Sequence, residues 1–377
     1  MKLTCAQSEL SSALHLVSRA ITSRPTHPIL ANVLLTADAA TGTLTLTGFD
    51  LNLGIQAQIP ASVDRSGATT LPARLFGEII SRLAADSPIT LSERNGDQID
   101  VTSISGSYQI RGLAAEEYPG LPLEQSGSPA VINVEVLTEA LAATIFASSN
   151  DESKQILTGV NLCLDGEELT CAATDGHRLA VMTTQQGTIG KQTFAATIPA
   201  KSMKELDRMM SSCRHETISL YYDKAQVVAT CGDQVLTTRT LDGTYPNYAQ
   251  LIPASFSKEI TINRRGLINA LERVAVLADQ HNNVIELSAD GSRGQVTVLA
   301  NAQDVGSGSE ELAAEFKGDD IEIAFNVRYL IDGLKSMSAD DVVLHCNSAT
   351  TPAVLRAPDD DGFTYLVMPV QVRKEGK

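Results

Sequence analysis

One segment of the sequence places a carboxylate and an imidazole two residues apart, at Asp175 and His177. Such a pair can exchange protons with a substrate as a general acid and base, so a hydrolase is one interpretation. The pair has no suitable nucleophile beside it, which counts against catalysis. A glycine-centred turn, with Asp175 bonded to local backbone and His177 partly buried, is a second interpretation. A surface that binds a peptide or another ligand is the third.

Other catalytic signatures are missing from the sequence. It has no GxxxxGK[ST] phosphate loop, no HExxH, no GxSxG and no cysteine and histidine set with zinc spacing. Gly306 and Gly308 are not followed by the third glycine of a dinucleotide fingerprint. We therefore expect no metal site and no cofactor, and Asp175 with His177 is the one candidate for catalysis that the sequence offers.

The elements that carry these residues repeat along the chain. The pattern LxxAL begins at Leu10, Leu137 and Leu267, with spacings of 127 and 130 residues. Each copy continues with apolar residues at helical spacing, which predicts an amphipathic helix. Internal repetition of this kind sets the fold, so the copies define the domain organisation.

A second pattern recurs later in each copy. Arg74, Lys201 and Arg328 are spaced 127 residues apart, and each ends one of three similar segments, TLPAR, TIPAK and AFNVR. An acid stands four residues after each basic residue, and apolar residues at helical spacing come next. These acids are Glu78, Glu205 and Asp332. The pattern predicts a second helix in every copy, with Pro72 and Pro199 near the start of two of them.

Alternating segments lie between the two helices of each copy, beginning at Thr43, Glu168 and Gln295. Period-two alternation with many threonines and valines predicts strands with one buried face. We therefore predict an α+β fold of three tandem domains, each with two helices on antiparallel sheets. The predicted domains are residues 1–127, 128–254 and 255–377.

Composition and charge add limits. The chain has 377 residues, a length that suits two or three domains, and a formal net charge of −16 with a pI near 4.8. An acidic protein is a poor ligand for nucleic acid unless its basic residues gather on one face. The predicted helices carry many basic residues, either as a shared DNA-facing surface or as ordinary solvated positions. These residues are Arg19, Arg74, Arg82, Lys201, Lys204, Arg208, Arg264, Arg265, Arg273, Arg328 and Lys335.

The six cysteines form no CxxC pair, so we expect reduced and mostly buried thiols. That expectation favours the cytoplasm. No apolar run approaches the roughly 20 residues of a membrane span, and the N-terminus lacks a signal-peptide core. We expect no membrane partner.

Four segments resemble the bacterial β sliding clamps: RPTHPIL at 24–30, ATDGHRLA at 173–180, DGTYPNY at 242–248 and YLVMP at 365–369. With the threefold repeat, the resemblance covers the whole chain. It implies a DNA-clamp fold in which a head-to-tail homodimer forms a ring, with helices lining the hole. Such a ring encircles double-stranded DNA without sequence specificity and tethers the replicative polymerase as a non-catalytic processivity factor.

The resemblance also implies site residues. DNA contacts are expected from Arg24 and Arg74, with Lys201 and Arg328 added at the matching repeat positions. A hydrophobic groove for a short peptide is expected between the second and third domains. Its residues are Leu157, Thr174, Gly176, His177, Arg178, Leu179, Pro246, Leu251, Asn326, Tyr329, Pro352, Leu366, Met368 and Pro369. The expected dimer contacts are Tyr108 and Ile110 against Val276 and Leu277.

The partners implied for the groove are the replicative polymerase, through its α subunit, the clamp loader, other polymerases and repair proteins. The sequence departs from the familiar enterobacterial clamp at the rim of the groove, where Gln250 and Gln371 replace arginines and Asn282 replaces an aromatic residue. A hydrolase that uses Asp175 and His177, and a repeat scaffold with no role on DNA, remain the alternatives.

Overall fold

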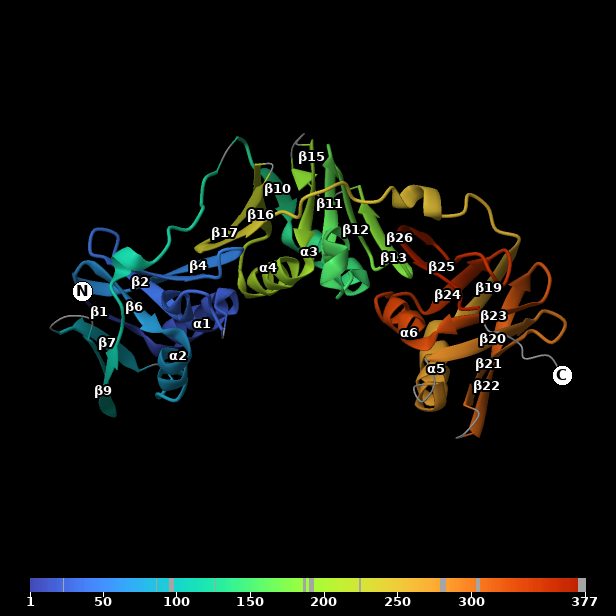
Figure 1. Ribbon diagram of the computed structural model, residues 1–377, viewed down its shortest axis with the longest axis horizontal. Helices are drawn as coiled ribbons and strands as arrows, with labels where there is room; N and C mark the ends of the chain where they lie inside the picture. Colours follow the sequence, from blue (N-terminus) through green and yellow to red (C-terminus); the bar gives the residue numbers. More distant parts are fainter. Residues whose placement is uncertain are drawn as a thin grey trace. The chain divides into compact units, whose positions relative to one another are not determined.

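The computed structural model describes residues 1–22, 24–85, 87–94, 98–125, 127–185, 188–189, 193–223, 225–278, 283–302 and 306–371. The chain divides into two compact units. Unit 1 contains residues 1–135, 188–192 and 201–240, and unit 2 contains 136–187, 193–200 and 241–377 (Figure 1). The second repeat therefore contributes strands to both units.

Both predicted sets of helices are present. The LxxAL helices are α1 (Gln7–Val17), α3 (Val134–Thr144) and α5 (Arg264–Ala278). The second helices are α2 (Ala73–Ser81), α4 (Ala200–Ser212) and α6 (Val327–Lys335). Leu10, Leu137 and Leu267 are at most 2% exposed, as the apolar stripe predicts. The 3₁₀ helices are η1 (Ser18–Ala20), η2 (Pro28–Ala31), η3 (Ala115–Glu117), η4 (Ile145–Ala147), η5 (Glu152–Thr158) and η6 (Tyr248–Leu251).

Unit 1 contains two antiparallel sheets among its described residues. Their orders are β5-β1-β7-β8-β9 and β14-β10-β16-β17-β18-β4-β3-β2-β6. Helix α1 packs on β3 and β4, and α2 packs on β2 and β6. The strands are β1 (Lys2–Ala6), β2 (Asn32–Asp38), β3 (Thr43–Phe49), β4 (Leu53–Pro60), β5 (Ser62–Arg65), β6 (Gly67–Pro72), β7 (Pro88–Glu93), β8 (Gln98–Ser103), β9 (Gly106–Arg111), β10 (Ala130–Asn133), β14 (Thr188–Ile189), β16 (Thr217–Asp223), β17 (Gln226–Cys231) and β18 (Gln234–Arg239).

Unit 2 contains one continuous strand order, β15-β11-β12-β13-β26-β25-β24-β19-β22-β21-β20-β23. Helices α5 and α6 pack side by side, α5 on β21 and β22 and α6 on β23 (Figure 1). The strands are β11 (Gly159–Asp165), β12 (Glu168–Thr174), β13 (Arg178–Thr184), β15 (Thr193–Pro199), β19 (Lys258–Asn263), β20 (Val284–Asp290), β21 (Gln295–Ala302), β22 (Gly306–Lys317), β23 (Ile321–Asn326), β24 (Asp341–Cys346), β25 (Ala353–Ala357) and β26 (Asp360–Val367).

Strand pairing joins neighbouring repeats in the same way twice. In unit 1, β4 of the first repeat pairs antiparallel with β18, the last strand of the second, and Ile55 lies opposite Leu236. In unit 2, β13 of the second repeat pairs antiparallel with β26, the last strand of the third, and Ala180 lies opposite Tyr365. Backbone hydrogen bonds between strands therefore join neighbouring repeats. Domains that follow one another in the chain need not be joined in this way.

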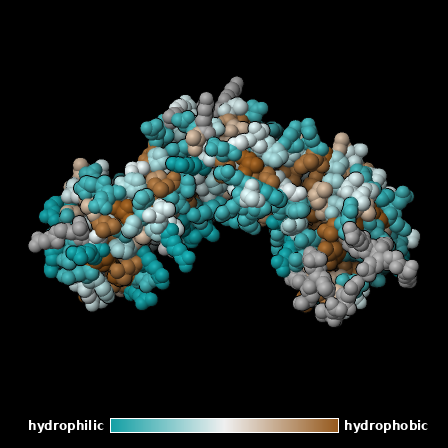
Figure 2. Space-filling view, viewed as in Figure 1, coloured by the Kyte–Doolittle hydropathy of each residue, from teal (hydrophilic) through white to brown (hydrophobic). Residues whose placement is uncertain are grey.

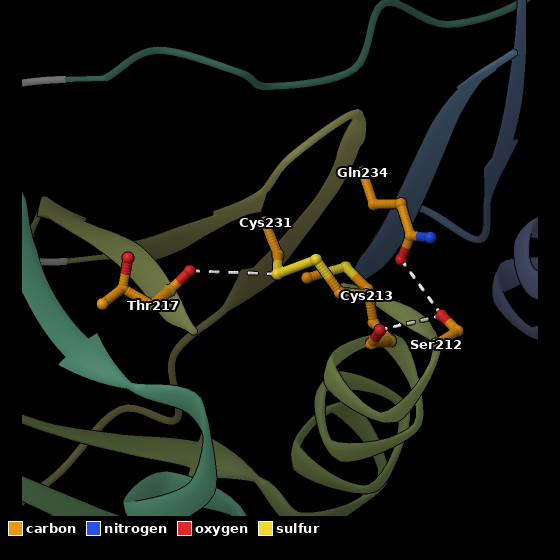
Figure 3. The surroundings of a disulfide bond; sticks show 6 residues. Ser212, Cys213, Thr217, Cys231 and Gln234 are labelled. Carbon is orange, nitrogen blue, oxygen red and sulfur yellow. Dashed lines mark hydrogen bonds between the residues drawn. A yellow bond between two sulfur atoms is a disulfide. The ribbon is translucent and has the colours of Figure 1, made fainter. Parts of the chain in front are cut away.

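The expectation of six reduced cysteines is wrong for two of them. Cys213 and Cys231 form a disulfide, with Cα atoms 6.4 Å apart (Figure 3). The local sequence gives no sign of this pair, because the residues are 18 positions apart and meet only when the end of α4 packs beside the end of β17. The free cysteines are Cys5, Cys163, Cys171 and Cys346.

Apolar residues fill the interiors, while hydrophilic residues cover most of the visible surface of each unit (Figure 2). Among the described residues, no helix combines the length and apolar character that crossing a membrane would need.

Candidate functional site

The turn between β12 and β13 begins at Thr174 and ends at Arg178. Oδ1 of Asp175 accepts hydrogen bonds from the backbone N–H groups of His177 (2.8 Å) and Arg178 (3.1 Å). Gly176 has φ +94°, a backbone conformation that residues other than glycine rarely adopt. The prediction of a glycine-centred turn is therefore confirmed. The partial burial expected for His177 is wrong, because the turn leaves its side chain exposed.

Arg178 is the centre of the site and is only 8% exposed. Its Nε donates to Oδ2 of Asp175 at 3.1 Å, and its Nη1 donates to Oδ2 of Asp332 on α6 at 2.6 Å. Its Nη2 donates to the backbone oxygen of Phe146 at 2.8 Å. The guanidinium thus joins the turn in the second repeat to a helix of the third. Burial works against its charge, but the hydrogen bond to Asp332 and the nearby charges raise the pKa of Arg178 above its ordinary value.

Aromatic rings enclose the guanidinium. Cζ of Arg178 lies 4.6 Å from the ring centre of Tyr329 and 5.4 Å from that of Phe146, both suitable for cation–π attraction. The hydroxyl of Tyr365 donates to the backbone oxygen of Tyr329 at 2.8 Å, and burial raises the pKa of the Tyr365 phenol. These contacts fix Arg178 and Tyr329 in position relative to each other.

The exposed side of this site carries His177 and Met368. The His177 ring stacks on Tyr329 with centroids 6.3 Å apart and an interplanar angle of 19°. The backbone N–H of Met368 donates to the oxygen of His177 at 2.8 Å, and the Met368 side chain is 39% exposed. Leu179 lies opposite Leu366 in the β13–β26 ladder, and both are buried. The structure thereby brings together eight of the predicted groove residues: Thr174, Gly176, His177, Arg178, Leu179, Tyr329, Leu366 and Met368.

The remaining predicted groove residues have other local roles or positions. Asn326 caps α6 by accepting from the N–H of Arg328 at 3.0 Å, and the oxygen of Leu157 accepts from Ser149 at 2.8 Å. Leu251 is 53% exposed and Pro246 is also exposed. Pro352 and Pro369 are half-buried beside β25 and after β26, respectively.

The positions that depart from the enterobacterial pattern divide into two groups. Gln250 and Gln371 are exposed. Asn282 lies outside the described residues.

Three of the four predicted DNA contacts occupy matching positions. Arg74, Lys201 and Arg328 are each the second residue of α2, α4 and α6. The side chain of Arg74 is 93% exposed beside Glu78, and that of Lys201 is 66% exposed beside Asp50. Arg24 is exposed near η2.

The predicted dimer contacts differ in burial. Val276 is 68% exposed, Tyr108 is 40% exposed and Leu277 is half-buried. Ile110 is only 2% exposed, because its side chain faces the interior of the first repeat. Ile110 therefore packs within its own repeat and does not offer an exposed apolar side chain to a second copy.

Four residues of the site were absent from the predicted groove: Phe146, Asp175, Asp332 and Tyr365. The sequence did contain a signal for Asp332, which is the acid four residues after the basic residue of the third repeat. Its equivalent in the second repeat, Glu205, also lies beside an arginine of the preceding repeat, with Arg19 Nε at 3.6 Å. In the second and third repeats, this acid therefore pairs with an arginine of the preceding repeat.

Three repeats of two helices on antiparallel sheets, joined by strand pairing, define the fold of a sliding clamp. Three family models for the DNA polymerase III beta subunit match the chain: the model of the N-terminal domain at residues 1–122, that of the central domain at 131–247 and that of the C-terminal domain at 249–371. The chain belongs to the DNA polymerase III beta subunit family, and the predicted fold of three tandem clamp domains is confirmed.

Relatives agree with this family over the whole chain. The beta sliding clamp of Synechococcus elongatus is 51% identical over 375 residues, covering 99% of this chain and all of the relative. The sliding clamp structure from Bacillus subtilis has a TM-score of 0.93 at 29% identity and covers 99% of both chains. The clamp of Pseudomonas aeruginosa bound to griselimycin has a TM-score of 0.93 at 26% identity, covering 99% of this chain and 100% of that one.

Proposed function

We propose that two copies of the chain join head to tail in a closed ring around duplex DNA and tether a polymerase there without themselves catalysing a reaction. The observation that carries this proposal is a pair of strand edges, one in the first repeat and one in the third. Among the described residues, β9 pairs only with β8, and the Gly306–Ala313 part of β22 pairs only with β21. Each edge is therefore available to another chain.

The two edges correspond to the strands that join the repeats. Each repeat contains three consecutive strands that pair in order: β2, β3 and β4 in the first, β11, β12 and β13 in the second, and β20, β21 and β22 in the third. Strand β22 is the third of its group, as β4 and β13 are of theirs. Strand β9 is the last strand of its repeat, as β18 and β26 are. Both junctions within the chain pair those two kinds of strand. Pairing β22 of one copy with β9 of a second repeats the rule, and doing so twice closes a head-to-tail dimer.

The repeat also predicts the register of this pairing. Tyr108 corresponds to Leu236 and Tyr365, and Gly308 corresponds to Ile55 and Ala180, so Tyr108 should lie opposite Gly308. A Cβ on Gly308 would lie 2.9 Å from Cδ1 of Leu277, so the glycine leaves room beside that side chain. Tyr108 would then cover Gly308 and contact Leu277 and Val276.

DNA binding is supported by basic residues at equivalent places in an acidic chain. Arg74, Lys201 and Arg328 begin equivalent helices, and Arg24 is exposed as well. Contacts from such residues to phosphates carry no sequence information, so they are compatible with sliding.

The Arg178 site is the proposed docking place for partner peptides. Met368 and His177 are exposed beside a buried apolar cluster that includes Leu179 and Leu366, an arrangement that suits a peptide with apolar anchors. We propose that the replicative polymerase, through its α subunit, the clamp loader, other polymerases and repair proteins compete for it.

A topological assay tests the ring. The protein, loaded with its clamp loader onto nicked circular DNA, should stay with the DNA through gel filtration and be lost after a single linearising cut. Light scattering should give twice the 40.1 kDa mass of the chain. A monomer at micromolar concentration, or equal retention on circular and linear DNA, would contradict the proposal.

A separate assay tests the peptide site. Met368→Ala should weaken binding of a peptide copied from the C-terminal end of the replicative polymerase by about tenfold, since an exposed anchor contact is lost. The matched control is Leu113→Ala, an apolar position in unit 1 that is 37% exposed, close to the 39% of Met368. A truncation that begins at Tyr365 is unsuitable, because Tyr365 is fully buried in β26.

A further inference from the structure

The disulfide joins two elements of the second repeat within unit 1. Cys213 is the first residue after α4, and Cys231 is the last residue of β17 (Figure 3). After Cys231 the chain turns at Gly232 and Asp233 into β18, the strand that pairs with β4 of the first repeat. The bond therefore ties a helix to the turn beside a junction between repeats.

We propose that Cys213 and Cys231 form a reversible redox site that a dithiol reductant opens and an oxidised dithiol closes. A thiolate of the dithiol attacks Sγ of Cys213, the S–S bond breaks, and its electron pair leaves with Sγ of Cys231, which takes up a proton. The second thiolate of the reagent then displaces Cys213 from the mixed disulfide. The chain gains two electrons and two protons, and the dithiol becomes a cyclic disulfide.

The direction of attack follows from burial. Cys231 is 1% exposed, whereas Cys213 is half-buried and is followed by the exposed residues Arg214 and His215. Both cysteines line a cavity of about 1040 Å³. Arg214, His215 and exposed side chains of α1 line the same cavity. A reductant can approach Cys213 from this side, and the positive charge of Arg214 favours a thiolate there.

The surroundings also accommodate the reduced state. Sγ of Cys231 faces the backbone oxygen of Thr217 at 4.0 Å (Figure 3). A disulfide sulfur has no hydrogen to donate, but the thiol formed on reduction can donate to that oxygen. Opening the bond therefore creates a buried thiol that already has an acceptor.

The free cysteines differ from this pair. Burial raises the pKa of Cys5 and of Cys171 to about 12, and it raises the pKa of Cys163 and Cys346 as well. These thiols are poor nucleophiles at neutral pH, so exchange is expected at Cys213 and Cys231 alone.

The redox state has a route to the junction between repeats. The oxygen of Asp233 accepts from the N–H of Gln58 at 2.9 Å, and Gln234 lies opposite Ala57. Without the disulfide, the Ser212 hydroxyl, which donates to Oε1 of Gln234 at 3.3 Å, is the next direct link between the end of α4 and this turn. Reduction should therefore loosen the turn and the end of the β4–β18 ladder.

Alkylation followed by intact-mass measurement tests the bond. After treatment with oxidised dithiothreitol and denaturation, the protein should take up four alkyl groups, one for each free cysteine. After treatment with reduced dithiothreitol it should take up six, the number of cysteines in the chain. Cys163→Ser should still lose two sites on oxidation, and Cys213→Ser should lose none. Uptake of six groups by the oxidant-treated protein would overturn the proposal.

Hydrogen exchange tests the coupling. Reduction should speed exchange of the Gln58 amide at least severalfold and lower the melting temperature by about 5–10 °C, the scale for a loop of this length. Cys213→Ser should show the fast exchange under both conditions, whereas Cys163→Ser should behave as the unchanged protein. Equal exchange at Gln58 in the two redox states would overturn the coupling. These measurements do not involve DNA or peptide, so they are independent of the clamp assays.

Discussion

Arg178 joins the turn between β12 and β13 in the second repeat to helix α6 of the third. Its guanidinium contacts two carboxylates, two rings and a backbone oxygen, so its orientation is set from several sides. Asp332 supplies the shortest of these contacts at 2.6 Å, and it comes from the third repeat. Asp332 is therefore a positioning residue for the proposed peptide site.

Asp332→Ala should weaken binding of the polymerase peptide by about five- to tenfold, because Arg178 and the Tyr329 ring lose a fixed arrangement. The Asp332 side chain is 44% exposed, so we expect a small loss of stability, about 1 kcal/mol or less. Calorimetric titration of the peptide and thermal melting measure the two effects.

The control for that change is Glu78→Ala. Glu78 occupies the matching position of the first repeat but pairs with Arg74 of its own helix. Its removal should leave peptide affinity unchanged. Equal loss of affinity in both variants would show that the effect of Asp332→Ala does not come from its contact with Arg178.

Gly333 on α6 packs against Tyr365, and a Cβ at this position would lie 2.1 Å from the Tyr365 ring. Gly333→Ala should therefore cost about 1–3 kcal/mol of unfolding free energy through overpacking. Gly77 on α2 has no atom within 4 Å of such a Cβ. Gly77→Ala should instead stabilise the protein by up to about 1 kcal/mol through helix propensity. Denaturant unfolding compares the two, and equal signs would contradict this account.

At the scale of elements, local patterns predicted what was local. The LxxAL stripes and the alternating segments indicated the helices and strands because side-chain periodicity reports burial of one face. The pairing of β4 with β18 and the Cys213–Cys231 bond join residues that the chain brings together only on folding, so no local pattern contains them. The burial of Ile110 and the exposure of His177 depend on which way a strand and a turn face, which composition also leaves open.

The repeated register gives a direct test of the junction between two copies of the chain. By correspondence with the two internal junctions, Ser107 of one copy should lie opposite Ser309 of the other. Opposite residues of a ladder are about 4.5–5.5 Å apart between Cα atoms, within reach of a disulfide. The double variant Ser107→Cys with Ser309→Cys should therefore form a cross-linked dimer under mild oxidation.

The comparison variant combines Ser107→Cys with Glu311→Cys, two residues out of register. It should cross-link far more slowly, as non-reducing electrophoresis will measure. Equal rates would mean that the strands do not pair in the register of the internal junctions.

At the scale of the whole molecule, the net charge of −16 and a DNA-binding role are compatible only if basic residues act locally. Arg74, Lys201 and Arg328 provide such positions because the repeat places them at the same point of equivalent helices. Binding to DNA should then depend on few phosphate contacts and on enclosure. High salt should weaken encounter with linear DNA while leaving a closed ring on circular DNA.

Salt dependence measures the local contacts. Arg74→Ala removes one contact per chain and two per ring, so the slope of log K against log salt on a short linear duplex should become shallower by about 2. Lys317→Ala is the control, because Lys317 lies on strand β22 and its side chain, 82% exposed, pairs with Glu259. If both variants change the slope equally, binding reflects charge alone, and the helix register has no special role in contacting DNA.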